Sequence, residues 1–507
     1  MSNRTRVAML VNNDWRIDSR VMREAATLAA AGHEVHVVSR VTAPGAPLRH
    51  GEVQVHEIAQ AASIRRHPAG VLALWRLHLQ VAGAARRNPN GSRAFLAAWA
   101  SAAVAAGIAL LVLVLLPLLA PPAALLLLAR RRYRRSRWRE PATQAQSGLR
   151  AMLVRRALGT VRALMAGTLG VILPEHVRYL NGFGVDGLGR VLDLSPDVVH
   201  AHDLVTLSTG RAAAVASGCR LVYDAHELET HTNYWSLAAA THRWIATYES
   251  SLIRRCDAVV TVCDSIADWL AAHYGIERPV VVLNSPDLQG AAASPFRSVR
   301  SDLGLAPTVP LAVYVGAVSI DRGLPQCVQA AAQVPGLHLA LVGPRDATVA
   351  EELRALARLL AIEDRVHLVD PVPSSEVAGY VASADCSLIA IQNVCLSYYY
   401  CFPNKLLESV MSGLPVAAAR LAELERFLDR FPVGVLMDER EPASIAQAIR
   451  TLLQDPGQYR PGPEVLATIR RDYGWPAQQS RLRALYDRLS GAPSAPPHDP
   501  LHHSKTG

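Results

Sequence analysis

A run of thirty-six residues without a formally charged side chain, residues 94–129, constrains this chain more than any other feature. A stretch this long and apolar predicts a membrane segment, because only lipid favours a helix that is apolar on all its faces. Seven arginines follow directly within residues 130–139, and arginine clusters stay with the anionic, cytoplasmic leaflet. The sequence therefore predicts a protein attached to the cytoplasmic membrane, with its folded domains on the cytoplasmic face.

The same segment is marginal for two full membrane crossings. At a rise of ~1.5 Å per residue it gives roughly 27 Å for each of two arms, against a hydrocarbon core of ~30 Å. Pro117, Pro121 and Pro122 offer a turn between the arms. Because the strands predicted on its two sides belong to one sheet, we expect a re-entrant or short hairpin that returns to the side it left. The alternative is a buried pair of helices within a soluble fold.

Positive charge is concentrated beside this segment. The whole chain has a formal net charge of +9, but residues 86–162 alone hold fourteen arginines and one acid, Glu140, so the remainder is slightly acidic. A nucleic-acid-binding protein would spread its basic residues over a groove or helix face of the folded body. The pattern therefore predicts an anionic membrane surface as a partner and excludes a nucleic acid.

Outside the insert, short apolar runs alternate with longer amphipathic stretches, which predicts an α/β protein. One series of predicted strands comprises Arg6–Val11, Glu34–Ser39, Asp197–His200, Arg220–Asp224, Ala258–Val262 and Val280–Leu283. A second comprises Leu311–Val315, Leu337–Val342, Val366–Leu368, Ser387–Ile391, Val416–Ala418 and Gly434–Met437. Strands and helices in this order imply parallel sheets with right-handed crossovers. We expect two Rossmann-like domains facing across a cleft at the carboxyl ends of their strands.

The pattern predicts six segments along the chain. These are an N-terminal Rossmann-like domain in two parts (1–85 and 166–290, the second on the acceptor side), the hydrophobic and arginine-rich insert (86–165), a C-terminal Rossmann-like domain (291–474), a crossing helix (475–490) and a disordered tail (491–507).

A stretch near the carboxyl end of the second series carries groups suited to an anionic ligand. It reads LSYYYCFPNKLLESVMSGLPVAAA from Leu396, and Asn404 opens an amphipathic helix after Pro403. A helix N-terminus offers unpaired N–H groups and the positive end of the dipole. An ammonium at Lys405 suits a diphosphate, and a carboxylate at Glu408, one turn on, suits a ribose diol. The alternative is an ordinary helix with a solvated Lys–Glu pair.

With these motifs the chain resembles the family 4 glycosyltransferases, retaining enzymes of the GT-B fold. PNKLLES followed by GLPV resembles their donor-binding signature, and YVGAVSIDRGL resembles their diphosphate loop. The other similar stretches, in chain order, are DSRVMREAATLAAAGHEVHVV, SPDVVHAHDL, LVYDAHELE and YGWPAQQSRLRALYDRL. Six matches in the family's order cover both domains and leave out only the insert and the tail.

The resemblance implies a role for each matched residue. Arg322 and Lys405 would stabilise the leaving diphosphate, and His202 would lie near the reacting carbon, so these three are the predicted catalytic residues. Tyr400 stands where the family has a glutamate that contacts sugar hydroxyls. The predicted donor-binding residues are Gly316, Gly343, Val372, Tyr400, Phe402, Asn404 and Glu408, and the predicted acceptor-side residues are Asn12, Asp18, Arg20, His226 and Glu227.

These features predict a retaining glycosyltransferase of cell-envelope polysaccharide or glycolipid synthesis that uses no metal ion and no cofactor. A UDP- or GDP-linked sugar would be its substrate, and a membrane lipid, a lipid- or polyprenyl-linked saccharide or a polysaccharide precursor its acceptor. In such enzymes the leaving diphosphate oxygen is thought to take the acceptor's proton, so the protein supplies mainly electrostatic stabilisation. Two alternatives are a non-catalytic relative that serves as a membrane assembly scaffold, favoured by Tyr400, and a GT-B sugar-nucleotide epimerase.

Overall fold

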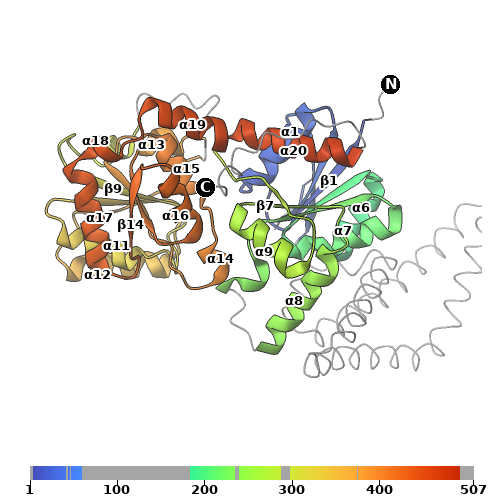
Figure 1. Ribbon diagram of the computed structural model, residues 1–507, viewed down its shortest axis with the longest axis horizontal. Helices are drawn as coiled ribbons and strands as arrows, with labels where there is room; N and C mark the ends of the chain where they lie inside the picture. Colours follow the sequence, from blue (N-terminus) through green and yellow to red (C-terminus); the bar gives the residue numbers. More distant parts are fainter. Residues whose placement is uncertain are drawn as a thin grey trace, which may run out of the picture. The chain divides into compact units, whose positions relative to one another are not determined.

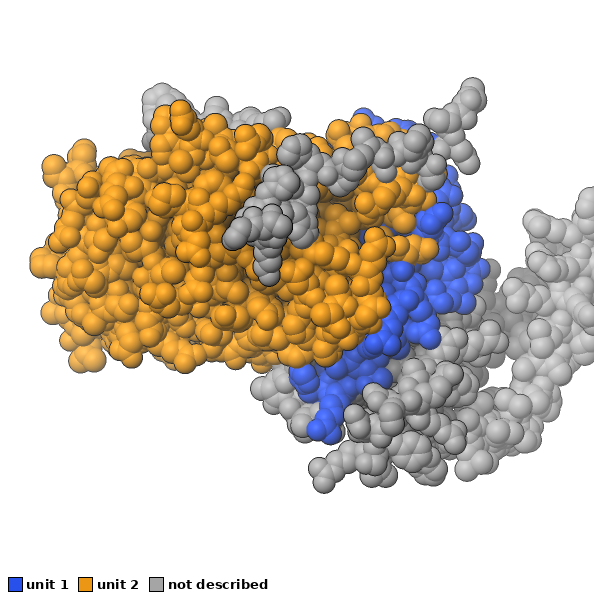
Figure 2. Space-filling view, in the orientation of Figure 1, with its two compact units in different colours: residues 1–17, 33–223, 237–256 blue, residues 18–32, 224–236, 257–507 orange. Residues whose placement is uncertain are grey.

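The computed structural model describes residues 4–41, 44–45, 47–59, 183–233, 239–286, 297–373 and 375–490. Two compact units are distinguished (Figure 2): unit 1 comprises residues 1–17, 33–223 and 237–256, and unit 2 comprises residues 18–32, 224–236 and 257–507. The domain boundaries drawn above from the sequence remain a prediction.

The predicted membrane insert, residues 86–165, lies outside the described residues, and so does the predicted tail. Among the helices that are described, none is long and apolar enough to cross a membrane.

Unit 1 is built on strands that are mainly parallel. Their order is β3 (Leu48–His50), β4 (Val53–Ala59), β2 (Glu34–Val41), β1 (Arg6–Val11), β5 (Val198–His202) and β6 (Arg220–Ala225), and the last two residues of β6 belong to unit 2. β3 pairs with β4 in the antiparallel sense, whereas β1 pairs with β2 and β5 in parallel. β5 is buried throughout, as expected for a strand covered on both faces. The helices among the described residues of this unit are α6 (Gly184–Leu194), α7 (Asp203–Ser217) and α8 (Ala239–Ile253).

Unit 2 contains a wholly parallel six-stranded sheet (Figure 1). Its order is β11 (Val366–Val369), β10 (His338–Val342), β9 (Leu311–Val315), β12 (Cys386–Ile389), β13 (Val416–Ala419) and β14 (Gly434–Met437). The five residues of β9, LAVYV, are all buried. The unit also holds the short strands β7 (Ala258–Thr261) and β8 (Val280–Val281), which pair in parallel.

Helices cover both faces of this sheet. One buried cluster joins it to α11 (Leu324–Gln333), α12 (Ala347–Leu359) and α17 (Pro442–Gln454). Two others join it to α10 (Val299–Asp302), α13 (Val377–Val381), α15 (Asn404–Met411), α16 (Ala422–Arg430) and α19 (Pro463–Tyr473). The remaining elements of unit 2 are α1 (Ser19–Ala30), the short helix η2 (Glu229–His231), α9 (Asp264–Tyr274), α14 (Leu396–Tyr399), α18 (Pro456–Tyr459) and α20 (Trp475–Ser490).

The strand order of unit 2 reverses between β9 and β12. From β9 the chain continues to β10 and β11 on one side, and then returns to β12, β13 and β14 on the other. Loops that leave the carboxyl ends of two such strands diverge, and ligands of open parallel sheets bind in the crevice between them. The topology therefore predicts a ligand site at the loops after β9 and β12.

A pair of buried histidines links β2 and β4 in unit 1. His36 Nδ1 lies 3.0 Å from His56 Nε2, and His36 Nε2 lies 3.0 Å from Glu34 Oε1. Both histidines are buried. Burial, with the charges of His36 and Arg190, lowers the pKa of His56 from 6.5 to about 4, so the folded protein keeps this imidazole neutral at pH 5.

This histidine predicts an acid-sensitive stability. Between about pH 6.5 and pH 4 the unfolded chain binds the His56 proton and the folded chain does not, so stability falls as the pH is lowered. The contribution to the free energy of unfolding decreases by about 2 kcal/mol from pH 7 to pH 5. Thermal melts at both pH values should show a smaller acid-induced loss in His56→Gln than in the wild type. An equal loss in both proteins would contradict this assignment.

Candidate functional site

Two glycines bring the loops after β9 and β10 into close contact. Gly316 directly follows β9, and its N–H donates to the Val342 carbonyl at 2.9 Å. Gly343 follows β10 with φ +148°, and a Cβ there would lie 2.2 Å from the Gly316 carbonyl oxygen. A side chain at position 343 would therefore push the two loops apart, which explains glycine at this predicted position.

Lys405 lies next to Gly316. It occupies the first turn of α15 and is 9% exposed. Its Nζ lies 3.9 Å from the centre of the Tyr314 ring, and a Cβ at Gly316 would come within 3.3 Å of it. A side chain at position 316 would therefore crowd the ammonium, which has the Tyr314 ring beside it.

Arg322 approaches the same place from the loop after β9. Its guanidinium carbon lies 5.2 Å from the centre of the Tyr398 ring on α14. The side chains of Arg322 and Lys405 form no ion pair or hydrogen bond with the residues that the structure describes. Burial, and then the charge of Arg322, lower the pKa of Lys405 from 10.5 to about 7, although Glu408 acts in the opposite direction. Two cations are thus held together without a side-chain ion pair, and Glu408 is a carboxylate that stabilises the Lys405 charge without pairing with it.

The other predicted donor-side residues surround these cations to different extents. Glu408 is half-buried on α15, and burial raises its pKa. Asn404 is exposed at the first position of that helix. Phe402 packs against Tyr473 and Phe427, with ring centres 5.9 Å away in both cases. Val372 is half-buried after β11 and packs against the core.

Tyr400 ends α14 and contributes its backbone to a contact. Its carbonyl accepts from the Cys263 thiol at 3.0 Å. Its ring lies beside Tyr399, with ring centres 5.3 Å apart. The side chain is half-buried, and its predicted role toward the donor sugar remains a prediction.

Strained backbone accompanies two of the predicted catalytic residues. Asp203, which follows His202, has φ +62°, and Asp321, which precedes Arg322, has φ +58°. Non-glycine residues in this region are uncommon and gather at functional sites. His202 itself is fully buried at the end of β5 and stacks on His200, with ring centres 4.5 Å apart.

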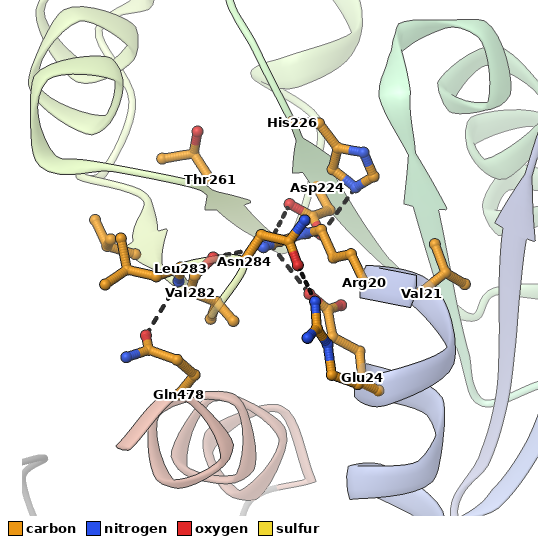
Figure 3. Close-up of polar contacts among 12 residues, drawn as sticks. Arg20, Val21, Glu24, Asp224, His226, Thr261, Val282, Leu283, Asn284 and Gln478 are labelled. Atoms are coloured by element: carbon orange, nitrogen blue, oxygen red, sulfur yellow. Dashed lines mark hydrogen bonds and ion pairs between the residues drawn. The ribbon is translucent and has the colours of Figure 1, made fainter. Parts of the chain in front are cut away.

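Arg20, a predicted acceptor-side residue, lies in a buried ion-pair cluster (Figure 3). Its guanidinium donates two hydrogen bonds to Asp224, both 2.9 Å, and one of 2.6 Å to the Val282 carbonyl. Glu24 lies 3.1 Å away on α1. Burial disfavours the charge, but Asp224 and Glu24 outweigh it and raise the pKa of Arg20. His226 joins this cluster, because its Nε2 lies 3.4 Å from Asp224.

The remaining acceptor-side predictions lie in other contacts. Asn12 accepts a hydrogen bond from Arg40 at 3.0 Å within unit 1. Asp18 caps α1 by accepting from the Val21 N–H at 3.0 Å. Glu227 lies 3.5 Å from the Ser397 hydroxyl of α14. The structure therefore brings Arg20 and His226 together, because both side chains contact the Asp224 carboxylate. It places Glu227 beside α14.

This geometry suits an anion with more than one charged oxygen. Two cations and the N-terminus of the eight-residue helix α15 converge at the strand-order reversal, and such groups stabilise a diphosphate. Among the described residues, the surroundings of Arg322 and Lys405 contain no cluster of three metal-ligating side chains. The positive charge at this place is supplied by the protein itself.

Comparison with known proteins assigns the family. Residues 169–289 match the model of the family described as "Glycosyltransferase Family 4". Residues 309–455 match the model of the family described as "Glycosyl transferases group 1". The chain is 30% identical over 323 residues to the D-inositol 3-phosphate glycosyltransferase of Acidothermus cellulolyticus, covering 59% of this chain and 69% of that protein. The chain belongs to the family 4 glycosyltransferases.

Solved structures agree with this family at the level of the fold. Sucrose-phosphate synthase from Thermosynechococcus elongatus superposes with a TM-score of 0.61 and 17% identity, covering 96% of this chain and all of that one. The Anabaena protein HepE in complex with UDP-glucose gives 0.52 and 17%, covering 61% and 84%. The predicted GT-B fold, with its two parallel-sheet domains, is thereby confirmed for this glycosyltransferase.

Several residues of the site were missed by reasoning from the sequence. Tyr314 and Tyr398 provide the aromatic faces next to the two cations, and Asp224 joins Arg20 to His226. Tyr314 is recognisable in retrospect, because it is the penultimate residue of an otherwise aliphatic strand. No sequence signal indicates the contact with Tyr398.

Because the Lys405 ammonium is buried, we expect this residue to lower the free energy of unfolding at pH 7. Between about pH 7 and pH 10.5 the unfolded chain binds its proton more tightly than the folded chain, so stability rises with pH. From pH 7 to pH 9 the gain is about 2 kcal/mol. Lys405→Met keeps the stem and removes the charge, and should be more stable than the wild type at pH 7.

Urea unfolding of both proteins at pH 7 and pH 9 measures this effect. Between pH 7 and pH 9 the variant should lack the gain in the free energy of unfolding that Lys405 contributes in the wild type. If both proteins gain equally, Lys405 is not the desolvated cation described here.

Proposed function

We propose that this glycosyltransferase transfers a sugar, with retention of configuration and without a metal ion, from a nucleotide-sugar donor to a lipid- or polyprenyl-linked acceptor at the cytoplasmic face of a membrane. The observation that supports the donor part is the pair of cations Arg322 and Lys405, whose side chains form no ion pair with the described residues, although Glu408 stabilises the Lys405 charge. A diphosphate would pair with both cations directly.

The donor part of the proposal gives each group a task. Arg322 and Lys405 neutralise charge that builds on the leaving diphosphate as the bond to the sugar breaks. The N–H groups at the start of α15 bind diphosphate oxygens, and Glu408 accepts from the ribose hydroxyls. A diphosphate oxygen then takes the proton of the attacking acceptor hydroxyl on the same face of the sugar. UDP is favoured as the nucleotide by the UDP-glucose complex of HepE, which shares the fold.

The acceptor part of the proposal rests on the sequence of the insert. A charge-free stretch of thirty-six residues followed by seven arginines within ten positions suits a hairpin in an anionic membrane. An enzyme anchored in this way meets acceptors that are themselves held in the bilayer, which favours a lipid-linked acceptor over a free sugar phosphate.

A non-catalytic scaffold is the second candidate, and Tyr400 favours it. An aromatic ring at a position where the family has a glutamate removes a carboxylate from the sugar side of the donor. The presence of Arg322, Lys405 and Glu408 favours the enzyme, because a scaffold has no use for two cations gathered beside a carboxylate.

The assay that separates these candidates uses membranes that contain the protein and a panel of radiolabelled UDP- and GDP-sugars. We expect label in the lipid fraction with one donor. Arg322→Ala and Lys405→Ala should each lower turnover by ~10²–10³, the usual cost of removing one charge-stabilising group. Arg354→Ala is the matched control, because Arg354 is an exposed arginine on α12 paired with Glu351. Equal turnover in all variants would contradict the donor-site assignment, and absence of transfer with every donor would favour the scaffold.

Deletion of residues 86–139, with a short Gly/Ser bridge, tests the acceptor assignment. The variant should leave the membrane fraction, because the apolar hairpin and arginines that add on the order of 1 kcal/mol each near an anionic surface are lost. Donor binding should persist, since Arg322 and Lys405 both lie outside the deletion, and it serves as the check on folding. Transfer to a lipid acceptor should disappear. Retention on membranes at wild-type levels would contradict the anchoring role.

A further inference from the structure

We propose that residues 227–233, the segment that follows β6, form a brace for the diphosphate site, and that Asn233 positions Arg322 by holding Asp321. The brace contacts both loops that carry the site, although none of its residues is in the donor signatures. This inference rests on the proposed function, because it assigns the segment a role at the same diphosphate site.

The first contact of the brace fixes the backbone beside Arg322. The Asn233 amide Nδ2 donates to Asp321 Oδ2 at 2.5 Å. The Asp321 carbonyl accepts from the Gln392 N–H at 3.1 Å, in the loop after β12. Asp321 is thus held through its side chain by the brace and through its backbone by the neighbouring loop.

The conformation of Asp321 explains why such a contact is needed. Its φ of +58° lies in the left-handed region, which a non-glycine residue adopts at a cost. Gly323, two residues on, has φ +67°, and a Cβ there would lie 2.2 Å from the Ala390 carbonyl oxygen. Arg322 therefore lies between two left-handed residues, and its direction changes if Asp321 relaxes to an ordinary conformation.

The second contact fixes the surface on which the Arg322 guanidinium lies. The Leu228 N–H donates to Ser397 Oγ at 3.2 Å, and Ser397 Oγ lies 3.5 Å from Glu227. Ser397 belongs to α14, and the next residue, Tyr398, provides the ring beneath the guanidinium at 5.2 Å. The brace thus holds both ends of Arg322, the backbone through Asp321 and the guanidinium through α14.

Asn233 acts in this arrangement as a positioning residue. Its amide contacts Asp321, and the group that meets the diphosphate is Arg322. Loss of the Asn233 side chain should displace the cation and leave the surfaces that meet the base and the ribose in place. The loss in affinity should therefore depend on the second phosphate of the ligand.

The test measures binding of UDP, GDP, UMP and GMP to the full-length protein by calorimetry. In Asn233→Ala the affinity for the bound nucleoside diphosphate should fall about tenfold, as expected for one charged contact out of place. The affinity for the corresponding monophosphate should change less than about twofold. Equal losses for both ligands would show general damage to the site and overturn the positioning role.

A double-mutant cycle with Asp321→Gly shows whether the effect passes through Asp321. Glycine adopts the left-handed conformation without the help of Asn233. Adding Asn233→Ala to Asp321→Gly should therefore change diphosphate affinity by less than about twofold. A tenfold loss that persists in the Asp321→Gly background would overturn the proposal.

Hydrogen exchange of the ligand-free protein separates this inference from the proposed function. Amides of residues 317–323 should exchange faster in Asn233→Ala than in the wild type. They should not change in Gln447→Ala, which removes an exposed amide on α17 that accepts from Arg450. A wild type that binds none of the four nucleotides contradicts the proposed function alone, whereas unchanged exchange in Asn233→Ala overturns the brace.

Discussion

The burial of the Lys405 ammonium beside a second cation, the half-buried Arg322, determines the character of this site. Lys405 is almost buried, Arg322 lies close enough to lower its pKa, and an aromatic ring lies beside each cation. A protein that needed only stability would pair the ammonium directly with a carboxylate or use an apolar residue, since an unpaired buried charge is costly. The arrangement is stable enough because the surrounding sheet and helices form a large core, and it is completed when an anion enters.

The parallel sheet of unit 2 explains why the cations meet at this place. β9 and β12 are neighbours at the reversal of strand order, so the loops that follow them part and leave room for a ligand. Gly316 and Gly343 allow the loops after β9 and β10 to approach closely, and Asp321 turns the chain so that Arg322 returns toward Lys405. The position of the charge thus depends on backbone geometry at a few residues as much as on the charged residues themselves.

Much of this could be predicted from the sequence, for physical reasons that differ between elements. β1, β9 and β14 are observed with the predicted bounds, because an apolar run between polar turns is characteristic of a buried parallel strand. Lys405 was found because it stands at a helix start in an arginine-rich chain. β3 and β4 were not predicted, since Val53–Ala59 mixes apolar residues with His56 and Glu57, whose burial depends on partners distant in sequence.

The contacts that position the site are the part that sequence reasoning could not supply. Asn233 and Asp321 are 88 residues apart, and Ser397 and Glu227 are 170 apart. Each is an ordinary polar residue of a loop or short helix, and only the fold brings them together. The same holds for Arg20 and Asp224, which are 204 residues apart. Only Arg20 of these two was assigned an acceptor-side role from the sequence, and that role remains a prediction.

The most direct test of the account is the proton balance of donor binding. At pH 8 most of the Lys405 population is neutral in the free protein, because its pKa is about 7. A bound diphosphate raises that pKa, so binding of a UDP-sugar should take up about one proton. Calorimetric titrations in buffers of different ionisation enthalpy measure this number. Uptake near one in the wild type and near zero in Lys405→Met agrees with a diphosphate bound at Lys405, whereas no uptake in the wild type would contradict it.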